Sequence, residues 1–261
     1  MRGLAGKYVL VTGGTRGIGK GVAERFLTEG SIVTIVGRHE DEAKKTVEEL
    51  SAIGEIDYQI ADLGKPETAE QVVEDFVARK GRIDILVNVA GIQIRKWATD
   101  FSIEEFNRVL DVNLKSYYFA SRTAFKYMRK QGGGSIVCIS SGNSNKYTSR
   151  RSAYNIAKTA VNGLVGTLAV EWARFGVRIN GVAPGYVATE MIKHGVEEGI
   201  IDVDSIMSVT PMKRMMSPEE IGNCVVFLAS DEASGVTGQT LFCDGGWDMC
   251  ALPEPEVLPE E

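Results

Sequence analysis

The loop Val11-Thr12-Gly13-Gly14-Thr15-Arg16-Gly17-Ile18-Gly19 joins a short apolar run, Tyr8 to Thr12, to a segment with the spacing of an amphipathic helix. Glycines at such a junction allow a tight turn, let the backbone approach a pyrophosphate and let the helix pack on the strand. The helix N-terminus offers free N–H groups and a positive dipole to phosphates. The spacing differs from G-x-G-x-x-G, but its place at the first strand-to-helix junction favours a dinucleotide site over a plain loop.

Outward from this loop, apolar runs alternate with amphipathic stretches along the chain. We expect strands at 8–12, 31–36, 56–60, 83–89, 134–140, 177–182 and 240–243, and helices at 17–29, 40–50, 66–79, 102–130, 152–174 and 218–229. This order predicts an α/β fold of the Rossmann type, with a doubly wound, mostly parallel seven-stranded sheet and helices on both faces. We find no repeat or linker, so residues 1–250 are predicted to form a single dinucleotide-binding and catalytic domain.

Composition narrows the class of protein further. The chain has 261 residues and a net charge of -6, which argues against nucleic acid as a partner. No run of 18 apolar residues and no signal peptide is found, so we expect a cytoplasmic protein without membrane contact. Four cysteines lack C-x-x-C spacing and the histidines number two, which predicts reduced thiols and no metal site. The acidic, proline-rich residues 251–261 are expected to be a tail.

Several further motifs resemble those of the short-chain dehydrogenase/reductase family. Asn88-Val89-Ala90-Gly91 resembles the N-N-A-G turn, and Ser141, Tyr154 and Lys158 match the S-x12-Y-x3-K signature. Asn113 matches the asparagine that completes the family tetrad, and Pro184-Gly185 matches the P-G motif after the sixth strand. The resemblance covers about residues 7–247. It implies hydride transfer between NAD(P)(H) and an alcohol/carbonyl pair.

The four matched residues suit that chemistry. Tyr154 and Lys158 lie four apart on a predicted helix and share one face, so the ammonium is expected to favour the phenolate of a general acid/base. The resemblance implies that Lys158 also binds the nicotinamide ribose. It implies that Ser141 holds the substrate oxygen and that Asn113 holds a water of a proton relay. Taken singly, each residue also fits a structural role, such as a helix kink at Asn113.

The resemblance also implies a set of cofactor contacts. Asp62 and Leu63 are expected at the adenine, and Val187 and Thr189 at the nicotinamide amide. Asn88 either lines the adenosine side or ties neighbouring strands together. The full cofactor set comprises Gly13, Thr15, Arg16, Gly17, Ile18, Gly19, Arg38, Asp62, Leu63, Asn88, Ala90, Gly91, Tyr154, Lys158, Pro184, Gly185, Val187 and Thr189.

The choice between NADP(H) and NAD(H) depends on the end of the second strand. Gly37 stands where an acid would bind both ribose hydroxyls, and Arg38 follows it. Together with Arg16, Arg38 would grip a 2′-phosphate, so NADP(H) is favoured. The alternative is that both arginines are solvated and that Glu40 or Asp41 reaches the ribose, which leaves NAD(H) possible.

Three segments are expected to wall the substrate, namely 92–97, 142–153 and a lid at about 186–216. Candidate substrate-binding residues are Gln93, Arg95, Ser141, Asn143 and Tyr186. Gly91-Ile92-Gln93 resembles the same loop in sugar-acid dehydrogenases of the gluconate 5-dehydrogenase type. Basic residues in the first two segments favour an anion, whereas methionines in the lid would build an apolar pocket.

The sequence thus predicts an enzyme that interconverts a secondary alcohol and a ketone, with a small polar substrate such as a sugar acid or polyol. The alternatives are a 3-ketoacyl-carrier reductase, a general carbonyl or steroid reductase and, more remotely, an inactive dinucleotide-binding sensor or scaffold. The family resemblance also implies a homotetramer in which the helices near 114–130 and 152–174 pair between subunits.

Overall fold

The computed structural model describes residues 1–197, 199 and 201–250, with Met191 described by its backbone alone. The predicted tail, 251–261, lies outside these residues. The described chain contains a seven-stranded sheet of order β3-β2-β1-β4-β5-β6-β7 in which every neighbouring pair is parallel. The strands are β1 (Tyr8–Thr12), β2 (Ile32–Gly37), β3 (Ile56–Ile60), β4 (Ile85–Asn88), β5 (Gly134–Ile139), β6 (Val177–Pro184) and β7 (Thr240–Cys243). The predicted Rossmann-type fold is confirmed.

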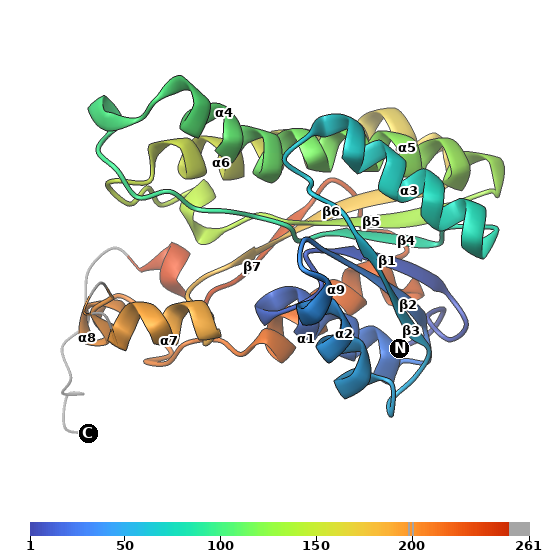
Figure 1. Cartoon of the computed structure of the whole chain (residues 1–261), viewed down its shortest axis with the longest axis horizontal. Helices are drawn as coiled ribbons and strands as arrows, with labels where there is room; N and C mark the ends of the chain where they lie inside the picture. Colours follow the sequence, from blue (N-terminus) through green and yellow to red (C-terminus); the bar gives the residue numbers. More distant parts are fainter. Residues whose placement is uncertain (198, 200, 251–261) are drawn as a thin grey trace.

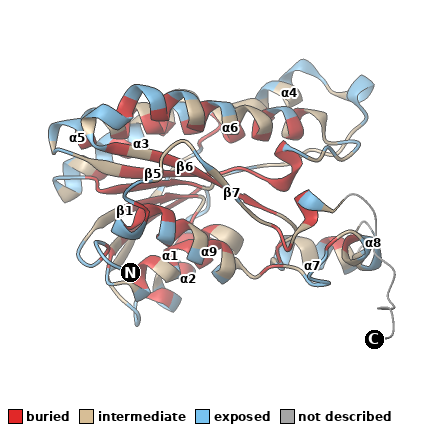
Figure 2. Ribbon diagram, turned by 180° about the vertical axis from the view of Figure 1, so that it is seen from behind, coloured by how far each residue is buried: buried red, intermediate tan, exposed pale blue. Residues whose placement is uncertain are grey.

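Helices cover both faces of the sheet (Figure 1). One face carries α1 (Gly17–Thr28), α2 (Glu40–Leu50) and α9 (Pro218–Ala229). The other carries α3 (Pro66–Lys80), α4 (Ile103–Leu110), α5 (Ser116–Lys130) and α6 (Ser152–Trp172). Because both faces are covered, the central strands are buried on both sides, as Figure 2 shows, and this explains their continuous apolar sequence.

Two apolar cores lie on opposite faces of the sheet. Phe76, Tyr117 and Leu164 belong to the core under α3, α5 and α6. Phe26 and Val225 belong to the core under α1 and α9. At the carboxyl ends of β1 and β4 the chain leaves the sheet in opposite directions, and this is the place where open α/β sheets bind ligands.

The structure departs from the predicted elements in two places. The single helix expected at 102–130 is divided into α4 and α5 by a π-helical turn at Asp111–Lys115, which contains Asn113. Two further helices, α7 (Glu190–Glu197) and α8 (Val203–Ser208), lie within the predicted lid. Within the described residues, no helix combines the length and apolar character needed to cross a membrane.

Candidate active site

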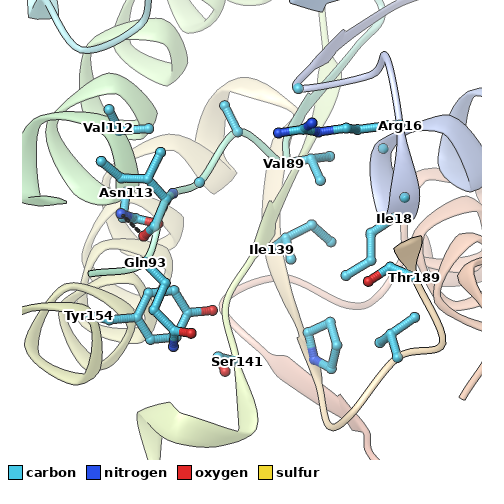
Figure 3. A pocket seen from close by; sticks show the side chains of 18 of the residues that line it. Arg16, Ile18, Val89, Gln93, Val112, Asn113, Ile139, Ser141, Tyr154 and Thr189 are labelled. Atoms are coloured by element: carbon cyan, nitrogen blue, oxygen red, sulfur yellow. Dashed lines mark hydrogen bonds between the residues drawn. The ribbon is translucent and has the colours of Figure 1, made fainter. Parts of the chain in front are cut away.

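A cleft of about 650 Å³ opens at the carboxyl ends of the strands. All the site residues predicted from the sequence line it except Asn88. Figure 3 shows Tyr154, Ser141 and Asn113 on one side of this cleft and Arg16, Ile18 and Thr189 on the other. The cleft therefore has two ends, which we call the cofactor end, around residues 13–19, and the substrate end, around Tyr154.

The cofactor end is shaped by glycine backbone. Gly13 has a φ of +67°, and a Cβ on it would lie 2.7 Å from Ala90 Cα. A Cβ on Gly19 would lie 2.0 Å from the Gly13 carbonyl oxygen. Arg16, the residue before α1, makes no side-chain hydrogen bond to the helix, so its side chain does not cover the N–H groups of the first turn of α1. A backbone cradle at a helix N-terminus fits the pyrophosphate of a dinucleotide.

The end of β2 leaves no room for an acidic side chain at Gly37. A Cβ there would lie 2.3 Å from Thr15 Cγ2. The acid of α2 that lines the cleft is Glu42, which lies 3.5 Å from Arg16 Nη1 and 3.5 Å from Thr15 Oγ1. Of the two acids expected as alternatives, Glu40 pairs instead with Lys44 at 3.0 Å, and neither it nor Asp41 lines the cleft.

Asp62 lies in a cluster with two arginines. Its carboxylate accepts from Arg108 Nη2 at 3.0 and 3.1 Å and from the Gly64 amide at 3.0 Å. Burial opposes ionisation, but the Gly64 amide, Arg108 and the nearby charge of Arg38 together lower the pKa of Asp62. Asp62 is therefore an anionic acceptor beside Arg38 at neutral pH.

Asn88 is buried at the end of β4 and stays outside the cleft. Its Nδ2 donates to Ser121 Oγ at 3.0 Å and to Cys138 Sγ at 3.6 Å. These bonds join β4 to α5 and β5. Two roles were considered for Asn88, a contact with the adenosine and a link between neighbouring elements. The geometry fits the link.

Tyr154 and Lys158 lie one turn apart on α6, and Lys158 Nζ is 5.8 Å from the centroid of the Tyr154 ring. Burial raises the pKa of Tyr154, and the Ser141 hydroxyl and the charge of Arg151 offset this only in part. The sequence led us to expect that the lysine would lower this pKa. The net direction is the reverse because desolvation of the phenolate is the largest effect.

Lys158 is almost fully buried, and its ammonium is held by groups that the sequence did not point to. Nζ donates to the Ile139 carbonyl at 2.7 Å and to the Tyr117 hydroxyl at 3.2 Å. Burial lowers the pKa of Lys158 to about 7. Tyr117 lies on α5, and its phenol pKa is raised well above the usual range by burial, so it stays neutral. Its hydroxyl therefore accepts from the ammonium without adding charge.

Ser141 and Asn113 complete the predicted tetrad. Ser141 Oγ accepts from the Asn143 amide at 3.1 Å, and the residue is buried beside the cleft. Asn113 Nδ2 donates to the carbonyls of Ile92 and Val109 at 2.9 and 2.8 Å. These bonds join the π-helical turn to the loop that leaves β4, so Asn113 is both the predicted kink and a support for the cleft.

The substrate end contains residues that the sequence did not single out. Trp247 lines the cleft and packs against Tyr186, with ring centroids 5.2 Å apart. It follows two glycines of positive φ, Gly245 at +67° and Gly246 at +87°. That Gly-Gly pair after the last strand was the available signal for a turn into the site. Arg108 and Glu42 gave no such signal, because both sit in ordinary charged helical sequence.

Comparison with known proteins gives consistent matches. A family model described as enoyl-(acyl carrier protein) reductase matches residues 13–248. 2-Dehydro-3-deoxy-D-gluconate 5-dehydrogenase of Dickeya dadantii is 36% identical, over 94% of this chain and 96% of its own. 7α-Hydroxysteroid dehydrogenase of Clostridium sardiniense is 35% identical, over 99% of this chain and 100% of its own. A crystal structure of a candidate NAD(P)-dependent gluconate 5-dehydrogenase from Beutenbergia cavernae, with bound NADP, is 38% identical with a TM-score of 0.88, covering 94% of this chain and 97% of its own.

Proposed function

This chain belongs to the short-chain dehydrogenase/reductase family of NAD(P)-dependent oxidoreductases, and on that basis we propose that it interconverts a secondary alcohol and a ketone on a small polar substrate, using NADP(H). One observation carries the proposal. Tyr154, Ser141, Lys158 and Asn113 meet at one cleft whose other end is a glycine cradle. A sensor or scaffold would have no use for a half-buried phenol and a buried ammonium at that point.

Tyr154 is the proton donor in ketone reduction and the acceptor in alcohol oxidation. Since burial raises its pKa, the phenol is protonated at neutral pH and ready to donate. Ser141 donates a hydrogen bond to the substrate oxygen and fixes it beside the phenol. When bound, the nicotinamide ring carries the hydride and, in its oxidised form, adds a positive charge beside Tyr154.

Lys158 positions the ribose and supports Tyr154. Its ammonium has two protein acceptors, Ile139 O and Tyr117 Oη, and its third proton points to neither. That remaining donor serves the ribose hydroxyls. Asn113 holds the wall of the cleft through Ile92 and Val109, and it lines the same cleft as Lys158, which supports a role for both in a proton relay.

NADP(H) is favoured over NAD(H) by the residues around Gly37. Thr15 occupies the space that an acidic side chain at Gly37 would need. Arg38 and Arg16 both line the cleft and are exposed, so they are available to a 2′-phosphate. Glu42 competes for Arg16 at 3.5 Å, a long contact that a phosphate would displace.

A polar substrate is supported by what lines the substrate end. Gln93, Arg95, Asn143 and Tyr186 all line the cleft. The lid methionines with described side chains, Met207, Met212, Met215 and Met216, line neither this cleft nor the smaller pocket beside it. The methionine wall considered from the sequence is thus absent from the described part of the lid, whose apolar side chains at these two pockets are Val187, Ile192, Ile201, Ile206 and Val209. A sugar acid or polyol fits this lining better than a steroid.

We also propose a homotetramer built on α5 and α6. These helices expose apolar side chains to solvent, with Tyr118 42%, Ile156 51% and Val170 84% exposed. A Cβ on Gly163 or Gly166 of α6 would meet nothing within 4 Å, so a second helix is free to approach there. Light scattering on the purified protein measures the state directly. The cytoplasmic location expected from the sequence stays a prediction.

A cofactor-linked absorbance screen tests the proposed function. Purified protein is assayed at 340 nm with NADPH or NADH against keto sugar acids, uncharged keto sugars, steroid ketones and 3-ketoacyl thioesters. We expect NADPH to be consumed with a keto sugar acid or keto sugar, and Tyr154→Phe supplies the background rate. Turnover confined to steroids or thioesters would contradict the substrate class, and turnover of nothing would contradict the function.

A further inference from the structure

Five basic side chains stand close to the substrate end, in the loops 91–97 and 145–151, and the structure divides them into two groups. Three are occupied by protein partners. Lys96 Nζ pairs with Glu105 at 2.5 Å. Lys146 Nζ donates to the carbonyls of Trp247, at 2.7 Å, and Cys250. Arg150 lies over the Trp97 ring, 5.8 Å from its centroid.

The other two, Arg95 and Arg151, have only amide partners. Arg95 Nε donates to Gln93 Oε1 at 3.3 Å. Arg151 Nη1 donates at 3.2 Å to Asn143 Oδ1, in the amide orientation that satisfies both ends of that side chain. Among the described residues, no carboxylate forms an ion pair with either guanidinium. Both guanidiniums are half-buried and neither is paired with an acid, so most of their ten N–H donors are available to an anionic ligand.

The guanidinium of Arg95 lies within reach of the positive charge of Arg151. Burial lowers the pKa of Arg95, and the charge of Arg151 lowers it further. Placing two positive charges side by side is unfavourable unless a negative group joins them. The pair is thus an arrangement that an anionic ligand would stabilise.

The two arginines stand where the main cleft meets a side pocket. Both line the cleft with Tyr154, and both also line a neighbouring space of about 190 Å³ with Tyr186 and α8. The carboxylate of this side pocket, Asp202, is exposed and caps α8, accepting from the Asp204 amide at 3.0 Å and from Ser205 Oγ at 2.5 Å. Those bonds hold it at the helix end.

We propose that Arg95 and Arg151 together bind the carboxylate of the substrate at the mouth of this side pocket, which makes the substrate a keto or hydroxy acid rather than a neutral polyol. The inference rests on the proposed function and narrows it. The carboxylate anchors one end of the substrate, and Ser141 and Tyr154 hold the reacting oxygen at the other. Chain length between carboxylate and carbonyl then decides which carbon reacts.

The test compares acids with neutral molecules that differ only in replacing the carboxylate by CH₂OH. The pairs are 5-keto-D-gluconate with L-sorbose, and acetoacetate with 4-hydroxy-2-butanone. Wild type is expected to prefer the acid in at least one pair. Arg95→Gln and Arg151→Gln should each lower the ratio of kcat/KM for that acid to kcat/KM for its neutral partner by about 10- to 100-fold. The ratio cancels any effect of the lost Arg151 charge on the pKa of Tyr154, because that effect acts on both substrates alike.

Lys96→Gln is the matched control, since it removes one charge from the same loop where Glu105 already holds it, and it should leave both substrates unaffected. NADPH binding and the melting temperature verify folding, and Arg95→Lys should restore part of the preference. Equal losses on acid and neutral substrates, or no acid preference in wild type, would overturn the carboxylate site while the oxidoreductase stands. If wild type reduces neither pair, binding of D-gluconate and glucitol to the NADP⁺-saturated protein is measured by calorimetry instead. Binding of gluconate that is lost in Arg95→Gln would support the carboxylate site, and any other result would overturn it.

Discussion

The cofactor end of the cleft is formed by backbone atoms, whereas the substrate end is formed by side chains. At the cofactor end, backbone makes the site, because Gly13 and Gly19 approach other main-chain atoms so closely that no Cβ fits. At the substrate end, long side chains from separate loops make the site, and their roles depend on which partners they have already found. Backbone sterics follow from local sequence, whereas side-chain pairing follows from tertiary contacts. Substitutions at the two ends should therefore differ in what they impair.

Tyr154→Phe tests the residue at which cofactor and substrate are proposed to react. We expect kcat to fall by at least about 100-fold, because general acid–base catalysis contributes that much and the hydroxyl at this position is lost. NADPH binding, measured by fluorescence titration, should stay within about threefold of wild type. Near wild-type turnover would show that another group moves the proton and that the tetrad is structural.

Gly19→Ala tests the backbone cradle. A Cβ at this position would meet the Gly13 carbonyl oxygen at 2.0 Å, so the loop has to shift. We expect NADPH affinity to fall by about 10- to 100-fold, the range for losing charge-assisted bonds to phosphate. Gly235→Ala, in the turn before β7, where a Cβ meets nothing within 4 Å, is the matched control and should bind NADPH normally. Unchanged affinity in Gly19→Ala would mean that the cradle does not hold the pyrophosphate.

Most of the fold was predictable because periodicity and glycine placement are local signals. All seven strands and the helices outside the lid were expected close to their observed bounds. A kink at Asn113 was one structural role considered, but a π-helical turn that divides the helix was not expected, because it is accompanied by the bond from Asn113 to the carbonyl of Ile92, 21 residues away. Helices α7 and α8 were missed because they have only eight and six residues, which is too short a stretch for an apolar period to be read with certainty.

The site residues likewise fall into those that local sequence predicts and those that only tertiary contacts reveal. The residues Ser141, Tyr154 and Lys158 could be predicted from their spacing, and they line one cleft. Tyr117 could not, because nothing in its sequence neighbourhood announces that its hydroxyl meets Lys158 at 3.2 Å. Likewise, five basic residues looked alike in sequence, and only their partners separate Arg95 and Arg151 from the rest.

Arg38→Asp asks whether side chains matter at the cofactor end as well. The arginine lines the cleft directly after Gly37, where it would meet a 2′-phosphate. We expect NADPH affinity to fall by about 10-fold or more, since an attractive charge becomes a repulsive one, while NADH affinity is maintained or improved. Titration of both cofactors by fluorescence measures this, with Lys20→Ala, on α1 outside the cleft, as the control. Equal NADH and NADPH affinities in wild type would reject the NADP(H) preference.

Tyr117→Phe is the smallest change. It removes only the hydroxyl that Lys158 donates to and keeps the ring against Lys158, 4.8 Å from Nζ. The Lys158 ammonium, with a pKa lowered to about 7, donates to that oxygen. Losing an acceptor disfavours the charged form, so the pKa falls further. Ketone reduction needs the ammonium, and the rate therefore declines as pH rises through the pKa.

This decline should move to lower pH in Tyr117→Phe, by up to about one unit, because a neutral hydrogen bond contributes roughly 0.5–1.5 kcal/mol and one pKa unit is 1.36 kcal/mol. Below that limb, kcat should approach the wild-type value. The measurement is the pH profile of kcat between pH 5 and 9, with Tyr118→Phe, an exposed neighbour on α5, as the control. A uniform loss of kcat at every pH would instead assign Tyr117 to packing alone, since packing does not distinguish the two protonation states of Lys158.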